Sequence, residues 1–226
     1  MKKKYIHQEV PTGPDTICHL KLYDGSAFDY SLNGNYGTLK GTAHYTYPGV
    51  DFDGDSDYIE IADATMFSPV STSMSISAWI YLDEATGFPI VTKYGTNKTE
   101  WVFDVGGADE LAFQIFDDSE TAFIGRLYNT ALAEDTWLHV VGTYENDASP
   151  TSADIKLYLN GAKVDDTDDE LGTFSEVENL GAPVWIGRAS GNFANGKIDD
   201  VIITKSVLSA TEVRSIYELT RWRYGV

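Results

Sequence analysis

The sequence predicts an all-β protein in which two antiparallel sheets pack as a sandwich or jelly roll, with one short helix near the C-terminus. Apolar and polar residues alternate in many short segments, which is the pattern of half-buried strands. Gly, Asn, Asp and Pro separate these segments and mark turns. Long helical segments do not come between them, so we expect turns to connect the strands into antiparallel sheets.

The strongest expected strands follow one another over most of the chain. They are residues 75–82, 111–116, 137–144, 154–160, 184–188 and 197–204. In the first of them Ile76 and Ile80 share one face, because side chains of a strand alternate between its two faces. The pair Asn160-Gly161 favours positive φ and predicts a two-residue turn, after which residues 162–164 return as the second strand of a hairpin.

One helix is expected after the last strand. Ser209 and Glu212 have the spacing of a capping box, in which each side chain bonds the backbone amide of the other residue. Val213, Ile216 and Tyr217 then repeat at helical spacing. We expect a helix over about residues 210–219 that lies against the sandwich.

The chain is expected to form one domain, because no low-complexity linker interrupts it. We place an N-terminal arm at residues 1–18, the jelly-roll domain at residues 19–220 and a tail at residues 221–226. Arm and tail are basic, with Lys2–Lys4 in one and Arg221–Tyr224 in the other. We expect them to dock, either on the acidic surface of the protein itself or on a protein partner or neighbouring copy.

The charge of the chain excludes some partners. Sixteen Lys and Arg residues stand against 35 acidic residues, which gives a formal net charge of −19. Such a field repels phosphate backbones and anionic lipids, so neither a nucleic acid nor a membrane is expected as a partner. Polyanionic glycans are disfavoured as well, unless a cation bridges them.

The sequence leaves the localisation unknown. No apolar run reaches the roughly 18 residues that span a bilayer, so no transmembrane segment is expected. His7 to Pro11 interrupt the place where a signal peptide needs an apolar stretch, so no signal peptide is expected either. The protein then either stays in the cytoplasm or leaves as part of a larger particle such as a virion.

Six short motifs appear in a familiar order. They are residues 29–37 (DYSLNGNYG), 52–59 (FDGDSDYI), 75–80 (SISAWI), 137–144 (WLHVVGTY), 157–161 (LYLNG) and 196–203 (GKIDDVII). Together with the helix start at residues 208–213, they resemble the laminin-G-like, pentraxin-like branch of the concanavalin A-like lectin and glucanase superfamily. The resemblance covers about residues 19–219 and implies a jelly roll. It does not fix a function, because lectins, hydrolases, lyases and structural modules share the architecture.

A calcium site is expected at the first of these motifs. Asp29, Asn33 and Asn35 supply a carboxylate and two amide oxygens around a glycine, and oxygen is the ligand that Ca²⁺ prefers. The resemblance implies that Asp199 of the last motif completes a structural calcium site. Leu32 stands where the family usually has Gly. The alternative is an Asx-turn in which Asp29 and Asn33 bond backbone amides and no metal is bound.

The sequence shows no catalytic set. Glucanases of this fold carry a Glu-x-Asp-x-Glu strand, and the nearest match, residues 145–149, lacks the third carboxylate. Glu176 and Glu178 lie in a loop without a third acidic partner, and His139 is expected to be a locally packed strand residue. The acidic segment at residues 51–57 lacks the glycine and glutamate positions of an EF-hand.

Glycan binding is the remaining candidate chemistry. Aromatic rings stack on the C–H faces of sugars, and nearby amide, acidic and Arg side chains bond their hydroxyl groups. The candidate residues in or beside expected loops are Tyr94, Trp101, Arg188, Asn192, Phe193 and Asn195. Trp79, Trp137 and Trp185 lie within strands and are expected in the core.

Recognition is therefore the leading functional hypothesis. We expect a non-enzymatic, calcium-stabilised adhesion module that binds a glycan or cell-surface polysaccharide, with a phage virion surface as one setting, such as a capsid decoration or fibre. A polysaccharide-active hydrolase or lyase of the same fold is the first alternative, and two facing carboxyl groups in a cleft would favour it. A purely structural subunit is the second alternative, and it would lack a ligand pocket.

Overall fold

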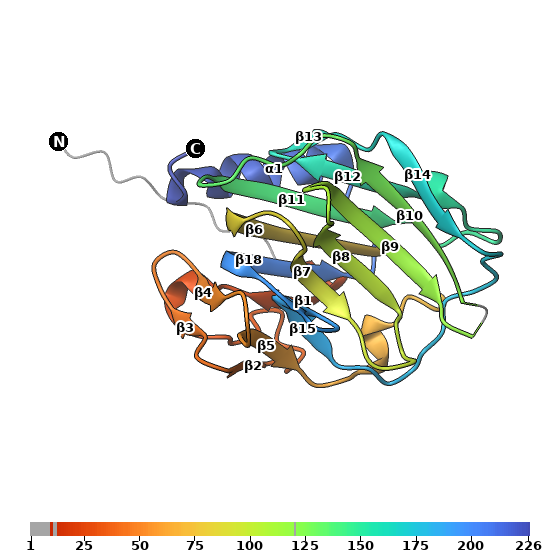
Figure 1. Ribbon diagram of the computed structural model, residues 1–226, viewed down its shortest axis with the longest axis horizontal. Helices are drawn as coiled ribbons and strands as arrows, with labels where there is room; N and C mark the ends of the chain where they lie inside the picture. The colour runs from red at the N-terminus through yellow and green to blue at the C-terminus, as the bar shows by residue number, and fades with distance from the viewer. Residues whose placement is uncertain (1–9, 11–12, 120) are drawn as a thin grey trace.

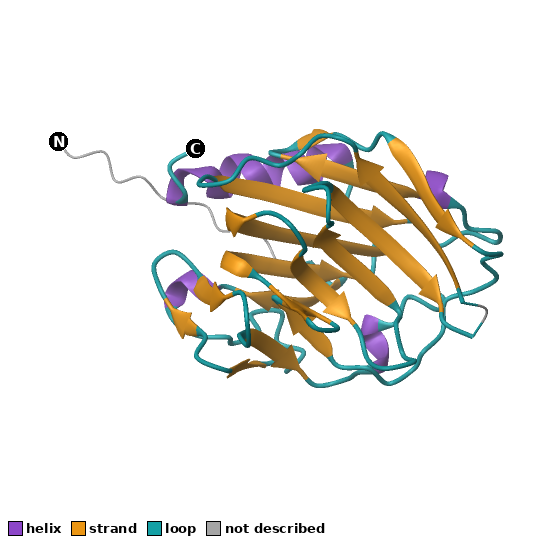
Figure 2. Cartoon of the chain, in the orientation of Figure 1, coloured by secondary structure: helices purple, strands orange, loops and turns teal. Residues whose placement is uncertain are grey.

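The protein is a two-layered β-sandwich in a computed structural model that describes residues 10, 13–119 and 121–226. Within these residues, two antiparallel sheets of eight strands each face one another (Figures 1 and 2). The predicted all-β sandwich with one C-terminal helix is therefore confirmed.

We call the first sheet, which contains the longest strand, sheet A. Its strand order is β13-β12-β11-β6-β18-β4-β3, and β1 also pairs with β18. The strands are β1 (Thr16–Leu20), β3 (His44–Tyr45), β4 (Val50–Asp53), β6 (Met74–Glu84), β11 (Trp137–Tyr144), β12 (Ile155–Leu159), β13 (Ala162–Lys163) and β18 (Asn195–Thr204).

The second sheet, sheet B, has the strand order β14-β10-β9-β8-β7-β15-β5-β2. Its strands are β2 (Gly37–Lys40), β5 (Tyr58–Ile61), β7 (Phe88–Lys93), β8 (Trp101–Val105), β9 (Leu111–Asp117), β10 (Ala122–Tyr128), β14 (Thr167–Leu171) and β15 (Val184–Ile186). In the view of Figure 1, β7, β8 and β9 lie in front of β6 and β11 of sheet A.

The remaining elements are short. A small hairpin joins β16 (Arg188–Ala189) to β17 (Asn192–Phe193), and the α-helix is α1 (Ala210–Thr220). The 3-10 turns are η1 (Leu22–Asp24), η2 (Thr65–Phe67), η3 (Ser152–Asp154) and η4 (Arg221–Arg223). Within the described residues, no helix has both the length and the apolar composition that crossing a membrane requires.

Two local predictions are confirmed in detail. The side chain of Ser209 accepts a hydrogen bond from the amide of Glu212, and the carboxylate of Glu212 accepts one from the amide of Ser209. Asn160 and Gly161 have φ values of 50° and 77° and join β12 to β13 as a hairpin. Both features depend only on neighbouring residues, which is why the sequence predicts them.

The core lies between the sheets. Ile76 and Ile80 of β6 face it as predicted, and Phe103 of β8 meets Phe113 of β9 edge to face at 5.6 Å between ring centres. The sheets approach closely at Gly142 of β11, where an added Cβ would lie 2.8 Å from the ring of Phe113. A glycine is therefore needed here for a large ring of the facing sheet to fit.

The outer face of sheet A is covered by α1 and the residues that follow it. Trp79 of β6 is only 1% exposed, and its ring stacks on that of Tyr224 at 4.0 Å and on that of Tyr217 at 5.8 Å. The indole Nε1 of Trp79 donates to the hydroxyl of Thr220 at 2.9 Å. This part of the face therefore carries a second, smaller core, in which Val141 and Tyr158 of the sheet pack against Val213 of α1.

The C-terminal tail docks on its own domain. The guanidinium of Arg223 lies 3.2 Å from a carboxylate oxygen of Asp200, and the hydroxyl of Tyr224 donates to Asp199 at 2.8 Å. For the tail, the structure thus matches the self-docking alternative. Lys2–Lys4 lie outside the described residues. Strand β1 begins at Thr16, so the last three residues of the predicted arm belong to sheet A.

The outer face of sheet B differs, because α1 does not pack on it. Trp185, Thr92, Val102 and Gln114 are cross-strand neighbours and form one row over β15, β7, β8 and β9. Side chains on either side of them in each strand belong to the core, so this row points outward. Trp185 and Gln114 of this row are partly exposed, whereas Thr92 and Val102 are buried, and the β16–β17 hairpin packs against β7. Among the described residues, the outer face of sheet B is thus partly open.

A buried ion cluster fixes the loop that leads into β15. Lys93 is fully buried, and its Nζ lies 2.9 Å from the carboxylate of Glu100 and 2.6 Å from that of Asp63. The same ammonium donates to the carbonyl of Ala182, and Glu100 accepts from the amide of Leu180. The three donors of Lys93 are satisfied, and the strand that carries Trp185 is held in place.

We expect Lys93→Met to lower the free energy of unfolding by about 3–5 kcal/mol, because it leaves the charge of Glu100 buried without a partner. The double variant Lys93→Met/Glu100→Gln should recover most of this loss, since Gln is uncharged and still accepts from Leu180. Urea unfolding of the two variants measures the difference. A single variant as stable as the unchanged protein would contradict the role of the cluster.

Candidate functional site

A cluster of aromatic rings around one arginine lies on the outer face of sheet B. The guanidinium carbon of Arg188 is 4.1 Å from the ring centre of Trp185, 4.6 Å from that of Tyr58 and 5.3 Å from that of Phe193. Tyr94 adds a further ring at 6.2 Å from Trp185. We call these five residues the Arg188 cluster. They are partly exposed, so rings and cation remain accessible from solvent.

Alternation in β15 places the central ring of this cluster. Val184 and Ile186 point into the core, so Trp185 between them must point outward. Gly187 then turns the chain with a φ of +81°, and an added Cβ there would lie 2.9 Å from the ring of Phe52. The turn brings Arg188 back over sheet B, where its carbonyl accepts from the hydroxyl of Thr92 at 2.7 Å.

A polar hollow of about 520 Å³ adjoins the cluster at Phe193. It lies between the ends of β6 and β8, the start of β7 and the β16–β17 hairpin. It is lined by Asp53, Gly54, Glu84, Thr86, Gly87, Phe88, Asp104, Gly106, Gly107, Gly191, Asn192, Phe193 and Asn195. We call it the acidic hollow, because all of its titratable lining residues are carboxylates.

The carboxylates of the acidic hollow have different proton affinities. Loss of hydration on burial, and next the charge of Asp169, raise the pKa of Asp104 to about 7. Hydrogen bonds from the backbone amides of Ser56, Asp55 and Asp57 lower the pKa of Asp53. One carboxyl group thus keeps a proton close to neutral pH, while a second in the same hollow is ionised.

A second aromatic pair lies farther along the same sheet. The rings of Phe116 on β9 and Phe123 on β10 are 5.2 Å apart. Together with Leu171 they line a hollow of about 340 Å³. The outer face of sheet B therefore carries apolar rings near both ends, with Thr92, Val102 and Gln114 between them.

Five of the six predicted ligand residues gather in this region. Tyr94, Arg188 and Phe193 belong to the Arg188 cluster, and Asn192 and Asn195 line the acidic hollow. Trp101 does not belong here. It is fully buried in the core, and its indole donates to the carbonyl of Phe67 at 2.9 Å, so it cannot meet a ligand.

The sequence reasoning missed the central residue of the site. Trp185 was expected in the core, but it is half-buried on the outer face. The signal was present, because Val184 and Ile186 are two apolar neighbours that place Trp185 on the opposite face. Nothing in the sequence brought Glu84 and Asp104 together, since they lie on different strands of different sheets.

The residues predicted to bind calcium are engaged in other bonds. The carboxylate of Asp29 accepts from the amides of His19, Ser31 and Asn35 at 2.9–3.0 Å. The side-chain amide of Asn35 donates to the carbonyl of Ile17, as does that of Asn33. For Asp29 this is the bonding of the Asx-turn alternative, whereas the side chain of Asn33 bonds backbone carbonyls and not the amides that this alternative expects. Leu32 has the left-handed φ of 68°, a conformation that favours the glycine usual in the family.

Asp199 has its own set of donors. Its carboxylate accepts from the amides of Tyr23 and Asp200 and from the hydroxyl of Tyr224. Burial, and next the charge of Asp200, raise its pKa to about 7. In the described part of the chain, no three His, Cys, Asp or Glu side chains are placed to hold a metal. Calcium stays a prediction, which unfolding with and without EDTA tests.

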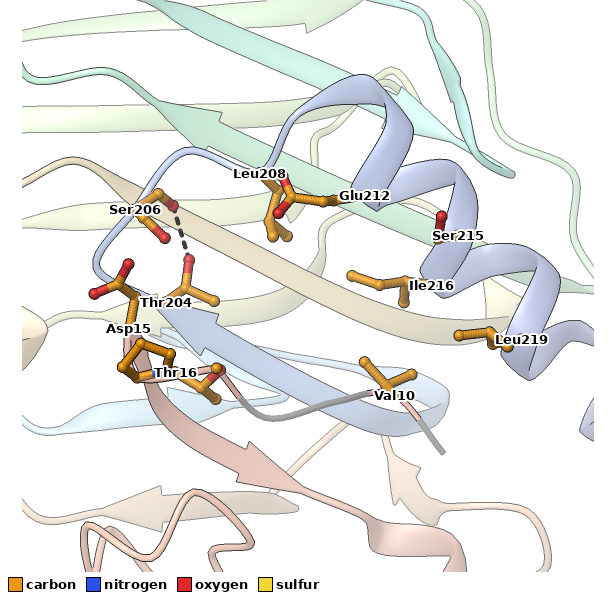
Figure 3. A pocket seen from close by; sticks show the side chains of 12 residues that line it. Val10, Asp15, Thr16, Thr204, Ser206, Leu208, Glu212, Ser215, Ile216 and Leu219 are labelled. Atoms are coloured by element: carbon orange, nitrogen blue, oxygen red, sulfur yellow. Dashed lines mark hydrogen bonds between the residues drawn. The ribbon is translucent and has the colours of Figure 1, made fainter. Parts of the chain in front are cut away.

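A third hollow, of about 440 Å³, lies between α1 and the start of β1 (Figure 3). Leu208, Ile216 and Leu219 give it an apolar wall. Its carboxylate at Glu212 is already bonded to Ser209. No aromatic ring is among the described residues that line it, so it offers no surface for stacking.

The fold and its open face define a lectin-like sandwich, and comparison with known proteins agrees. The chain belongs to the family described as the concanavalin A-like lectin/glucanases superfamily, whose family model matches residues 53–214. A comparison with curated protein sequences found no match.

Solved structures share the fold at low sequence identity. Domain 4 of AbnA, a GH43 extracellular arabinanase from Geobacillus stearothermophilus, was solved in complex with arabinotriose. It is 17% identical with a TM-score of 0.66, over 90% of this chain and 98% of that one. The receptor-binding domain of botulinum neurotoxin C/D mosaic serotype is 18% identical with a TM-score of 0.70, over 90% and 51%.

A third structure is the ligand-binding domain of botulinum neurotoxin serotype D in complex with N-acetylneuraminic acid. It is 16% identical with a TM-score of 0.69, over 90% of this chain and 50% of that one. The chain thus spans about half the length of the toxin domains that it matches. At these identities the likeness shows the fold alone.

We expect Asp104→Asn to remove a pH dependence of stability. The carboxyl group has a pKa near 7 in the folded protein and about 4 in the unfolded chain, so its contribution is fully present below pH 4 and is lost as the pH rises through 7. The variant should therefore gain stability over the unchanged protein between pH 5 and pH 8, by roughly 2–3 kcal/mol. Urea unfolding at pH 5 and pH 8 measures the difference in free energy of unfolding between the two proteins. The same difference at both pH values would contradict the prediction.

Proposed function

We propose that the protein is a non-enzymatic recognition module that binds a glycan on the outer face of sheet B. The observation that carries the proposal is the Arg188 cluster, in which partly exposed rings surround a cation on an open sheet face. Such rings offer flat apolar surfaces, and the acidic hollow beside them offers acceptors and donors for hydroxyl groups.

The cluster suits a ligand that is both apolar and polar. Sugar rings present C–H groups on their faces and hydroxyl groups at their edges. Trp185 and Tyr94 supply faces for stacking, while Asn192 and Asn195 in the adjoining hollow supply amide groups. Arg188 is already held by three rings, so the surface is rigid before the ligand arrives, which lowers the entropic cost of binding.

The structural neighbours support a glycan as partner. One was solved with arabinotriose and another with N-acetylneuraminic acid. Their contacts are not transferred to this chain, because the identities are only 16–17%. Adhesion at a virion surface, calcium stabilisation and a protein partner or further copy at the termini remain predictions from the sequence.

A glycoside hydrolase is the second candidate, and one observation favours it. The acidic hollow holds Asp104 with a raised pKa and Asp53 with a lowered one, the combination that general acid and nucleophile require. Against this role, the carboxylate of Asp53 already accepts hydrogen bonds from Asp55, Ser56 and Asp57 of its own turn.

Incubation with polysaccharides separates the two candidates. A binding module releases no reducing ends, which is the result that we expect from a colorimetric assay. Release of reducing ends that Asp104→Asn abolishes would establish the hydrolase instead.

We expect Trp185→Ala to weaken glycan binding by roughly 5- to 150-fold, since a stacked aromatic ring in a binding site contributes about 1–3 kcal/mol. The probe is a glycan array, followed by titration calorimetry with the best-bound oligosaccharide. Phe28→Ala is the matched control, because Phe28 is an exposed ring of a different cluster, with Tyr30 and Tyr36.

Unfolding curves for both variants show whether each is folded. If folded Trp185→Ala binds as tightly as the unchanged protein while Phe28→Ala does not, the binding surface lies at Phe28 and the proposal is wrong.

A further inference from the structure

We propose that the acidic hollow is a subsite for an uncharged sugar and that it excludes sugars with carboxylate or sulfate groups. The inference rests on the proposed function and narrows the class of ligand. We attribute the exclusion of anionic sugars to the residues that line the hollow and not to the net charge of the chain.

The acidic hollow lies directly beside the Arg188 cluster. Phe193 belongs to both features, since it lines the hollow and lies beside the guanidinium of Arg188. A sugar stacked on the cluster would thus have its neighbour in the hollow. The volume of about 520 Å³ is within the range of small-ligand sites, which begins at about 300 Å³.

The side chains that line the hollow can bond the hydroxyl groups of a sugar. Asp53, Glu84 and Asp104 are acceptors, and Asn192 and Asn195 add amide donors and acceptors. Carboxylates accept hydrogen bonds from hydroxyl groups, which neutral sugars offer in number. Five of the lining residues are glycines, so backbone amides and carbonyls are not screened by side chains.

The carboxylates of the hollow have no cation beside them among the described residues that line it. Among the described residues that line the hollow, none is Lys, Arg or His. The nearest cation of the site, Arg188, lies over Trp185, Tyr58 and Phe193 and donates to the carbonyl of Ser190. Like charges a few Å apart repel, and in a partly enclosed site this costs roughly tenfold or more in affinity.

Two glycines allow the hollow to be blocked without strain. Gly107 and Gly191 line it, neither has a positive φ, and a Cβ added to either meets nothing within 4 Å. Gly107→Phe should therefore fold and fill the space. Gly13→Phe is the matched control, since Gly13 has equally open surroundings but lines the hollow beside α1.

The test compares uncharged and anionic probes on the full chain. The probes are arabinotriose, cellotriose and a neutral glycan array on one side, and trigalacturonate, sialylated and sulfated glycans on the other. We expect the best ligands to be neutral and the anionic probes to bind at least tenfold more weakly. Gly107→Phe should abolish neutral binding, while Gly13→Phe should not.

A charge variant separates the hollow from the overall field. Glu84→Gln/Asp104→Asn should raise the affinity for trigalacturonate severalfold relative to arabinotriose. Glu145→Gln/Asp147→Asn removes two carboxylates from an exposed loop away from the hollow. It should leave that ratio unchanged when both variants are compared at pH 8, where Asp104 is ionised as well.

Each failure has its own meaning. Preference for anionic glycans, or neutral binding that survives in folded Gly107→Phe, overturns the subsite while glycan binding stands. If the two charge variants raise the affinity for trigalacturonate equally, the subsite is overturned too, because the net charge of the protein then accounts for the exclusion. Absence of binding to every probe overturns the proposed function and the inference with it.

Discussion

The stacking of Tyr224 on Trp79 fixes how the C-terminal segment lies on sheet A. Together with α1 this segment covers part of the outer face of sheet A, and the bonds from Tyr224 to Asp199 and from Arg223 to Asp200 hold it in place. A sheet with two apolar faces must bury both. Sheet A does so with residues of its own chain, and sheet B is left with a free face. This outer face of sheet B is the surface that we propose for glycan binding.

The free face is organised around a few fixed elements rather than by mobile loops. The buried ions at Lys93 hold the loop before β15, and the φ of Gly187 sends the chain back over the sheet. Trp185 then stands between Arg188 and the rings around it. Rings that are ordered before binding lose little entropy when a ligand stacks on them. Rigidity and exposure thus occur together at this site.

Carboxylates serve different purposes in different parts of the protein. Asp29 and Asp53 bond the amides of their own turns, and Asp199 bonds the amide of Tyr23, so these groups shape the chain. Asp104 is different, because its pKa is raised to about 7 and it lines a hollow. A sequence in which acidic residues are this frequent does not show which of them are structural, since that depends on the donors that folding brings to each.

The sequence alone determined the fold class, the hairpin at Asn160-Gly161 and the capped helix, because strand alternation, turn chemistry and capping act between near neighbours. Trp101 and Trp185 both occur in strands with apolar neighbours. Alternation shows on which face each ring lies, but Trp101 is buried and Trp185 half-buried because of what covers each face, which the sequence does not show. Nor did it bring Glu84 to Asp104 or Arg188 to Tyr58. The residues of each pair lie on strands that do not follow one another in the chain. Only the packing of the folded sheets brings these residues together.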